Sequence, residues 1–410
     1  MSDTKNLVII GAVWPEPNSS AAGQNMQGLL GAFVEQGWRV TFLCAANESI
    51  HTTPTDADIT FLSVNLNCSS FDVTIASLQP NVVIFDRFMT EEQFSWRVRE
   101  NCPDAMLVLN TEDLHSLRQA RYEAVKAGKP ACHASLNTPL AQREIAAVLR
   151  SDLSLIISPI EYDLLINHYQ VPSHQLLQLP LLMDIPQREV PDFAARKGFM
   201  TIGNFRHGPN WDAVLQLKQH IWPLIRKMLP EATLSIFGAY PPKKATALHD
   251  EKSGFLVKGW TDSAAEAISN ARIMLAPLRY GAGVKGKLIQ AMALGTPSVT
   301  TSIGAEGIGT AEQWPGLIID SDTTRFAQAA LTLYTDESHW QACQQRGFSL
   351  IHKQFNLTSN QHHLVAAVEC VYSQLSAHRG SLFLQAMLWH HTLRSCQYMS
   401  QWIEEKNKNS

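Results

Sequence analysis

Closely spaced glycines and two lysines in the second half of the chain form a pattern that suits the binding of phosphate groups. They lie in APLRYGAGVKGKLIQAMALGTPSVTTSIGAEGI, which spans Ala276 to Ile308. The glycines are Gly281, Gly283 and Gly286, and the lysines are Lys285 and Lys287. Glycine lets the backbone come close to a ligand, and a helix predicted to begin near Lys285 adds free N–H groups and a positive dipole end. We therefore predict a bend that holds a diphosphate and stabilises a departing nucleotide.

The same bend matches the G-x-G-x-x-G pattern of dinucleotide-binding proteins. Glu306 lies 20 residues after Gly286, where such proteins have an acid that binds ribose. That pattern belongs to the first strand–helix turn of a domain, however, and earlier strands are predicted in this half of the chain. Nicotinamide binding is therefore the less favoured alternative. Glu306 itself is a candidate for orienting hydroxyl groups of a donor or acceptor, with a solvated turn carboxylate as the alternative.

Further candidates follow predicted strands, at the sheet edge where α/β proteins bind ligands. Arg206 comes just after FMTIGN, and its guanidinium suits a bidentate contact with phosphate. His115 comes after AMLVLN, where a ligand contact and an ordinary helix-start histidine are both open. Gly23 ends the loop PEPNSSAAG, whose small residues allow donor phosphates or an acceptor to approach closely. Capping of the next helix by Ser19 or Ser20 would explain this loop without a ligand.

Short apolar runs alternate with stretches of helical periodicity, which is typical of parallel sheets built from βαβ units. In the first half the expected strands are Leu7 to Ala12, Arg39 to Ala45, ITFLSV, Asn81 to Asp86, Ala105 to Asn110 and Leu153 to Ser158. In the second half they are Phe199 to Asn204, Ala232 to Gly238, GFLVKG, Ala271 to Pro277, Thr296 to Thr301 and Gly316 to Asp320. Helices are expected between most of them, notably at Ala21 to Gln36 and Thr138 to Arg150. We predict an α/β protein with two Rossmann-like, doubly wound parallel-sheet domains that face each other across a cleft.

A break in this pattern separates the two halves. Pro180 to Gly198 contains three prolines and mixed charges, which predicts a linker. The expected limits are residues 1–185 for the N-terminal domain, 196–355 for the second domain and 356–410 for C-terminal helices. The last segment has an apolar stripe at helical spacing, formed by Leu382, Ala386, Trp389, Leu393, Cys396, Met399 and Ile403. We expect this stripe to pack on the chain's own domains, with a homodimer and peripheral membrane contact as open alternatives.

The composition excludes several classes of protein. The chain has 410 residues, 45% of them hydrophobic and 17% charged, and its formal net charge of -4 provides no basic excess for a nucleic-acid partner. Its seven cysteines contain no C-x-x-C pair, which favours unpaired thiols in a reducing compartment. The first apolar run lacks the features of a signal peptide, and no stretch of about 18 uncharged apolar residues occurs. We expect a cytoplasmic protein, with membrane association left open.

The segment from Ala276 to Ile308 resembles the donor-binding core of family 4 (group 1) glycosyltransferases, whose typical sequence is Pro-Leu-x-x-Gly-x-Gly-x-Lys-x-Lys-x-x-Glu-Ala-Met-Ala-x-Gly-x-Pro-Val-Val-x-Thr. Similarity continues upstream in IGNFRHGPNWDAV, LSIFGAYPP and VKGWTDSAAEAISNARIMLAPL. In the first half, NTEDLHSLR and EIAAVLRSDLSLIISPIEYDLL also look like that family. The resemblance covers most of the chain from Leu7 to about Phe355, and it is strongest in the second half.

This resemblance implies the GT-B fold, with a nucleoside diphosphate sugar bound by the second half and the acceptor bound by the first. It implies transfer with retention at the anomeric carbon. Arg206 would clamp the donor diphosphate together with Lys285, and His115 would lie near the transferred sugar. Gly203, Lys287 and the other glycines of the bend would line the donor site. The nucleotide sugar is then a co-substrate, and the acceptor is an unspecified glycan, lipid-linked molecule or protein.

The resemblance also implies that no cofactor or metal is needed. Asp320 and Asp322 form a D-x-D pattern of the kind that binds metal in the other large glycosyltransferase fold. Because they stand between a predicted strand and a predicted helix, we interpret them as capping residues. His390 and His391 are adjacent and diverge on a helix, so they make a poor metal pair.

The sequence departs from the family pattern at two positions. Gln290 stands where the family usually has the glutamate that contacts the nucleotide ribose, and Ala282 replaces the other glutamate of its E-x7-E motif. A glutamine can accept a hydrogen bond from a ribose hydroxyl, but without charge the bond is weaker. The resemblance implies a metal-independent, hexosyltransferase-type enzyme, whose activity the glutamine at position 290 puts in doubt, and two alternatives remain. One is a GT-B binding or scaffold protein with little or no catalysis, and the other is a sugar-nucleotide epimerase.

Overall fold

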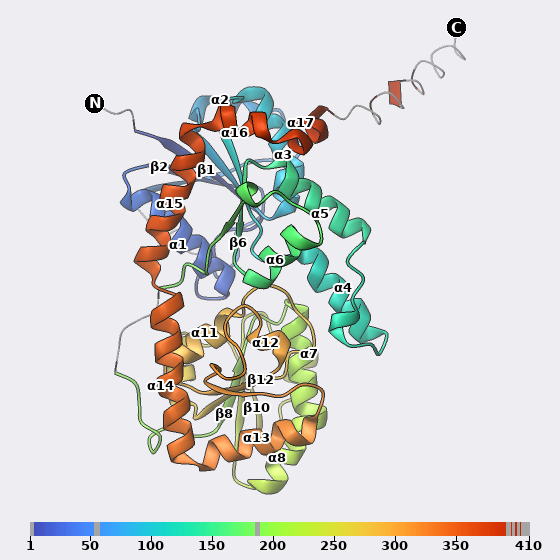
Figure 1. Cartoon of the computed structure of the whole chain (residues 1–410). Coiled ribbons are helices and arrows are strands. Elements are labelled where there is room, and N and C mark those ends of the chain that lie inside the picture. Colours follow the sequence, from blue (N-terminus) through green and yellow to red (C-terminus); the bar gives the residue numbers. More distant parts are fainter. Residues whose placement is uncertain are drawn as a thin grey trace.

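The computed structural model describes residues 4–52, 58–184 and 189–390, together with residues 395, 398, 399 and 402. Figure 1 shows two α/β domains, one above the other, and a run of C-terminal helices that passes from the second domain back onto the first. Each domain is built on a parallel sheet, so the predicted α/β class with two Rossmann-like domains is confirmed.

The N-terminal sheet has seven strands in the order β3-β2-β1-β4-β5-β6-β7, all parallel. They are β1 (Asn6–Gly11), β2 (Arg39–Cys44), β3 (Ile59–Ser63), β4 (Val82–Asp86), β5 (Met106–Asn110), β6 (Leu153–Ile156) and β7 (Leu176–Gln178). The helices between them are α1 (Ala21–Glu35), α2 (Ser70–Leu78), α3 (Phe88–Asn101), α4 (His115–Lys126), α5 (Pro139–Arg150) and α6 (Pro159–Asn167), with 3-10 turns η1 (Ala131–His133) and η2 (Ser173–Gln175).

The second sheet has six strands in the order β10-β9-β8-β11-β12-β13, again parallel. They are β8 (Phe199–Ile202), β9 (Leu234–Phe237), β10 (Phe255–Gly259), β11 (Ile273–Ala276), β12 (Ser298–Thr300) and β13 (Gly316–Ile318). The helices of this domain are α7 (Gly208–Gln216), the π-helical turn η3 (Leu217–Ile221), α8 (Trp222–Met228), α9 (Lys243–Thr246), α10 (Ala264–Asn270), α11 (Gly286–Ala293), α12 (Ser302–Ala305) and α13 (Thr323–Thr335).

The central strands are mostly apolar, as expected for parallel sheets that helices cover on both faces. On β1, Leu7 and Ile9 face one hydrophobic cluster, whereas Val8 and Ile10 face another. The predicted strands are all observed, each shorter by a few residues at most, and only β7 was not predicted from the sequence. It is a three-residue edge strand, too short to give a periodic signal.

The segment between the domains ends at an arginine that is buried in the second domain. Arg196 is fully buried, and its Nε donates to Pro191 O at 2.8 Å. Its Nη1 donates to Thr296 Oγ1 at 2.6 Å and its Nη2 donates to Leu294 O at 2.7 Å. Burial lowers the pKa of this guanidinium to about 10, so it stays charged at neutral pH. These bonds attach the end of the predicted linker to the second domain.

The C-terminal helices connect the two domains along one side of the molecule (Figure 1). Helix α14 (Glu337–Gln354) packs on α11, α15 (Leu357–Ser373) packs on α1, and α17 (Phe383–His390) packs on α5 after α16 (Leu375–Ser381). In the predicted apolar stripe, Leu382 is buried and Trp389 packs against the N-terminal core. Ala386 and Met399 are exposed, and Leu393, Cys396 and Ile403 lie outside the described residues. Contact of this segment with a membrane or a second copy stays a prediction.

Within the described part of the chain, no helix is both long and apolar enough to cross a membrane.

Replacing Arg379 by methionine is expected to destabilise the N-terminal domain by about 3–5 kcal/mol, because it leaves the fully buried Asp152 carboxylate without its cation. Arg379 on α16 donates to both carboxylate oxygens of Asp152, at 2.9 and 2.8 Å. Lys5→Met is the control, since Lys5 pairs with Glu369 on α15 at an exposed site worth at most about 1 kcal/mol. Urea unfolding followed by circular dichroism measures both, and equal midpoints for the two variants would contradict the prediction.

Candidate active site

A cavity of about 540 Å³ lies between the two domains, at the carboxyl ends of both sheets. The loops after β1, β4 and β5 line it from the N-terminal domain, and those after β8, β9 and β11 line it from the second domain. Ligands of open α/β sheets bind at this edge. Nine of the predicted site residues line this one cavity: Gly23, His115, Gly203, Arg206, Gly281, Lys285, Gly286, Lys287 and Gln290. Gly283 and Glu306 do not line it.

The glycine-rich bend, Gly281 to Gly286, joins β11 to α11 and faces the N-terminal domain. Gly283 has φ +61°, and a Cβ added there would lie 2.7 Å from the Cβ of Asp113. A Cβ on Gly286, the first residue of α11, would lie 2.3 Å from the Cβ of Ala21. Both positions therefore require glycine. Gly283 requires it because of its positive φ and the nearby Asp113, and Gly286 requires it because the first turns of α1 and α11 are in contact.

Lys287 is a cation with no acidic partner on the described part of the chain. Its Nζ donates to Asn210 Oδ1 at 2.6 Å, and that asparagine is held in turn through Nδ2 to Asn204 O at 3.0 Å. Burial within the cavity wall lowers the pKa of Lys287 to about 8. Because a poorly hydrated cation is stabilised by an anion, this ammonium is suited to a phosphate.

Lys285, by contrast, is already engaged by protein groups. Its side chain is 8% exposed, and its Nζ donates to Gly283 O at 2.8 Å. The Oε2 of Glu306 lies 3.7 Å from this Nζ. Burial lowers the pKa of Lys285, and the nearby Arg121 adds to that effect, whereas Glu306 opposes it. Lys285 therefore supports the bend as well as lining the cavity.

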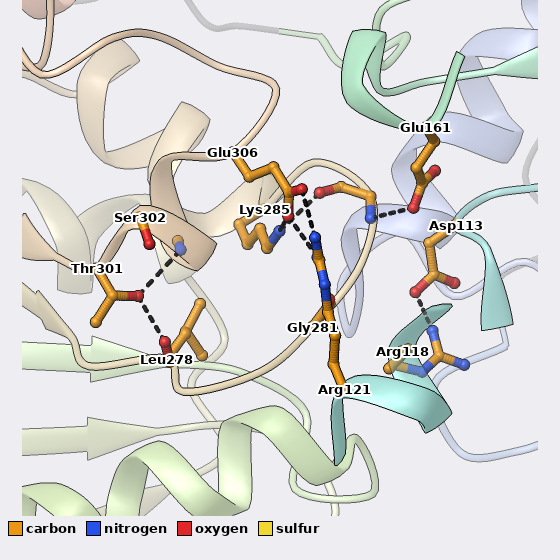
Figure 2. Close-up of polar contacts among 12 residues, drawn as sticks. Asp113, Arg118, Arg121, Glu161, Leu278, Gly281, Lys285, Thr301, Ser302 and Glu306 are labelled. Atoms are coloured by element: carbon orange, nitrogen blue, oxygen red, sulfur yellow. Dashed lines mark hydrogen bonds and ion pairs between the residues drawn. The ribbon is translucent and has the colours of Figure 1, made fainter. Parts of the chain in front are cut away.

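Glu306 is bound from the other domain. Arg121 on α4 donates from Nη1 to Glu306 Oε2 at 2.6 Å and from Nη2 to Oε1 at 2.8 Å, as Figure 2 shows. Nη1 of Arg121 also donates to Gly281 O at 2.8 Å. The carboxylate that the sequence predicted for hydroxyl binding is thus occupied by a bidentate arginine, and its role toward a ligand stays a prediction.

His115 is the first residue of α4, and its imidazole faces the cavity. The backbone N–H groups of His115 and Ser116 donate to Glu144 at 2.9 and 2.8 Å, which fixes the start of the helix. His115 Nε2 lies 3.4 Å from Asp113 Oδ1. Burial lowers the pKa of His115 to about 4, with Asp113 opposing that shift. The imidazole is therefore neutral at pH 7 and can both donate and accept a hydrogen bond.

Arg206 lies at the rim of the cavity, over an aromatic ring that touches both domains. Its guanidinium carbon is 3.5 Å from the centroid of the Tyr240 ring. The Tyr240 hydroxyl donates to Glu16 Oε1 at 2.8 Å, across the domain boundary. Stacking holds the guanidinium plane in place, so its N–H groups remain free to bind an anion. Gly203 allows this wall to pack closely, since a Cβ there would lie 2.5 Å from Asn210 Nδ2.

Gln290 reaches the opposite domain. Its Nε2 donates to Gln24 Oε1 at 2.9 Å, and both side chains line the cavity. Gly23 precedes Gln24 on α1, where Ser20 caps the helix by accepting from Gly23 N at 3.1 Å, as expected. The Gln290 amide oxygen keeps its capacity to accept a hydrogen bond, whereas its nitrogen is used by the protein.

Several polar residues of the N-terminal wall were not identified from the sequence. They are Asp86, Arg87, Glu112, Asp113 and Arg118. Arg87 and Glu112 follow β4 and β5 and have positive φ values of 71° and 59°. Asn25 and Asn110 both donate to Glu112 Oε1, at 3.0 and 2.9 Å, and burial raises the pKa of Glu112 to about 7. Four of them lie at or just after the carboxyl ends of the buried strands β4 and β5, and that position was the signal that could have found them, whereas Arg118 lies within α4.

The D-x-D pair behaves as capping residues. Asp322 accepts from Arg325 N at 2.8 Å at the start of α13, and Asp320 Oδ1 accepts from Ser302 N at 2.8 Å. Among the described residues, no group of three His, Cys, Asp or Glu side chains is arranged to hold a metal ion.

Residues 196–336 match the family model described as glycosyl transferases group 1. The matched residues include the glycine-rich bend, so the resemblance to group 1 glycosyltransferases is confirmed for this part of the chain. A curated relative, an uncharacterized 44.6 kDa protein in the cps region of Klebsiella pneumoniae, is 29% identical over 162 residues. That alignment covers 38% of this chain and only 42% of the relative.

Solved structures extend the similarity to the whole chain. Sucrose-phosphate synthase from Thermosynechococcus elongatus has a TM-score of 0.66 and 15% identity, over 91% of this chain and 99% of that one. Anabaena HepE in complex with UDP has a TM-score of 0.68 and 10% identity, over 90% of this chain and all of that one, 100%. At identities this low, the structural similarity shows the fold alone. It confirms the predicted GT-B architecture.

Proposed function

We propose that this protein is a retaining glycosyltransferase that moves a sugar from a nucleoside diphosphate sugar to an acceptor hydroxyl. The observation that carries the proposal is Lys287, a partly buried ammonium at the start of α11 that is bonded to an amide oxygen and, among the residues that the structure describes, to no carboxylate. A diphosphate is the natural partner of such a cation beside free helix N–H groups. The group 1 domain match and the UDP complex of HepE support this choice of donor.

In the reaction, the bond between the anomeric carbon and the diphosphate oxygen breaks while the bond to the acceptor oxygen forms on the same face of the sugar. The acceptor proton passes to an oxygen of the departing diphosphate. Lys287, Arg206 and the α11 N-terminus stabilise the negative charge that develops on the diphosphate. The neutral imidazole of His115 hydrogen-bonds the transferred sugar from the N-terminal wall.

The nucleotide sugar acts as a co-substrate, and protein cations neutralise its diphosphate without a metal or other cofactor. The acceptor binds on the N-terminal wall, where the Glu112 carboxyl lines the cavity. Closure of the two domains excludes water and so limits hydrolysis of the donor.

A donor-hydrolysis screen tests the proposal. The protein is incubated with UDP-, GDP- and dTDP-sugars without an acceptor, and released nucleoside diphosphate is measured. Slow release from one class of donor is expected, as water replaces the acceptor. Absence of both release and nucleotide binding in calorimetry would contradict the proposal.

The affinity for UDP is expected to fall about tenfold between pH 7 and pH 9. The pKa of Lys287 is about 8 without ligand, and a bound diphosphate raises it. Below pH 8 the ammonium is already charged, so affinity is constant; above pH 8 binding must take up a proton, and affinity falls by up to about tenfold per pH unit. Calorimetric titration of UDP from pH 7 to 9.5 measures this. Lys287→Arg keeps its charge over that range and should show a flat profile, whereas an unchanged slope would assign the titration to another group.

A binding or scaffold protein of the same fold is the second candidate, favoured by the hydrogen bond between Gln290 and Gln24. Gln290 stands where the family usually has a glutamate that contacts the nucleotide ribose. Here its amide nitrogen is bonded to the other domain, so the two domains are joined without a bound nucleotide. Nucleotide binding without donor hydrolysis or transfer in the screen would select this alternative.

A further inference from the structure

Two side chains of the N-terminal domain hold the backbone of the glycine-rich bend on either side of Ala282. Arg121 on α4 donates from Nη1 to Gly281 O at 2.8 Å. Glu161 on α6 accepts from Gly283 N at 2.7 Å. Figure 2 shows both contacts, with the bend lying between the arginine and the carboxyl group. The carbonyl before Ala282 and the amide after it are therefore both fixed from the opposite domain.

Both residues act from behind the cavity wall. Neither Arg121 nor Glu161 lines the cavity, whereas Gly281 and Ala282 do. Arg121 is aimed by its bidentate ion pair with Glu306, and both of these side chains are only 12% exposed. They are thus placed to shape the cavity wall without touching its contents.

Glu161 also joins the bend to the loop that carries His115. Its Oε1 accepts a second hydrogen bond from Leu114 N at 3.2 Å, one residue before His115. The residue is 1% exposed, and its Oε2 has no partner within the described part of the chain. Burial raises the pKa of Glu161 to about 8, so the neutral acid predominates at pH 7. One oxygen atom therefore sets the separation between the donor bend and the start of α4.

The bend needs this support because its conformation is unusual. Gly283 has φ +61°, and its amide would be buried without a partner if Glu161 were absent. The bend leads directly into Lys285 and Lys287, so a shift of its backbone moves both ammonium groups and the α11 N-terminus. A displacement of about 1 Å at a catalytic group can lower a rate by about 100-fold.

We infer that Arg121 and Glu161 are positioning residues that assemble the diphosphate-binding bend from across the domain boundary. The N-terminal domain, besides binding the acceptor, then sets the affinity and turnover of the donor. This inference rests on the proposed function, since it assigns to the bend the donor diphosphate.

Matched substitutions at Glu161 test the inference in the full-length protein. Glu161→Gln keeps an Oε1 that accepts from Gly283 N and Leu114 N, whereas Glu161→Leu has a similar size and no acceptor. We expect Glu161→Gln to retain donor kcat/KM within about threefold, and Glu161→Leu to lose about 10- to 100-fold with a matching rise in the Kd for UDP. Calorimetry separates this from partial unfolding, which lowers the binding stoichiometry and leaves Kd unchanged.

Arg121→Met is expected to raise the Kd for UDP by about tenfold, because it releases Gly281 O. Its control is Arg97→Met: Arg97 is 14% exposed and pairs with Asp72 inside the N-terminal domain, away from the bend. The control should bind UDP like the wild type.

The outcomes separate the inference from the function on which it rests. A wild-type protein that binds none of UDP, GDP and dTDP would overturn the proposed function. Wild-type binding together with an unchanged Kd in Glu161→Leu and Arg121→Met would overturn the positioning role alone. Equal losses in Glu161→Gln and Glu161→Leu would also overturn it, since only the latter removes the acceptor oxygen.

Discussion

Replacing Lys287 by methionine is expected to lower kcat/KM for the nucleotide-sugar donor by about 100- to 1,000-fold, the range found when one charge-stabilising group is removed from an active site. Its ammonium group has an amide oxygen as partner, at 2.6 Å, and no acid on the described residues. Methionine keeps most of the side-chain volume, so the loss reports charge rather than packing. Steady-state kinetics with the donor identified in the hydrolysis screen measures the effect.

Two further lysines make this prediction specific. Lys285→Met should lose only about 10- to 100-fold, because the Lys285 ammonium already contacts Gly283 O and Glu306. Lys227→Met, on the exposed surface of α8, should behave like the wild type. A Lys285 variant that loses more activity than the Lys287 variant would reverse our assignment of the diphosphate ligand.

The fold and the glycine-rich bend could be predicted from the sequence because each depends on residues that are close together in the chain. Runs such as Val82 to Phe85 are apolar and buried on both faces, which is typical of a parallel sheet covered by helices on both sides. The glycines of the bend were visible by their spacing. Their physical reason was not, since the Cβ that Gly286 excludes would contact Ala21, a residue far away in sequence.

The partners of the site residues could not be predicted for the same reason. Gln290 bonds to Gln24, and Glu306 bonds to Arg121, across 266 and 185 positions of sequence. Such contacts decide which candidates are available to a ligand: the Glu306 carboxylate is paired with an arginine, whereas the Lys287 ammonium has only an amide oxygen as its partner on the described residues. Spacing identifies residue types that could do chemistry, but their availability depends on contacts that only the packed domains create.

Introducing a methyl group at Gly286 is expected to lower donor kcat/KM by about 100-fold, because it forces α11 away from α1. The added Cβ would lie 2.3 Å from the Cβ of Ala21, and neither atom can rotate away. Gly286 is the first residue of a helix and has no positive φ, so alanine suits the local backbone there. Each domain of Gly286→Ala should therefore fold normally, and only the contact between α1 and α11 should be disturbed.

The rescue of this variant provides the decisive comparison. Ala21→Gly removes the atom that collides, so the double variant Gly286→Ala, Ala21→Gly should recover activity to within about fivefold of the wild type. Ala21→Gly alone should cost little activity, since the N-cap bond from Gly23 N to Ser20 is untouched. Recovery would mean that catalysis requires α1 and α11 to begin in direct contact, with Lys287 and the N-terminal wall on either side of the donor. If the double variant is as impaired as Gly286→Ala, the methyl group acts within the second domain, and contact between the helices is not what the reaction requires.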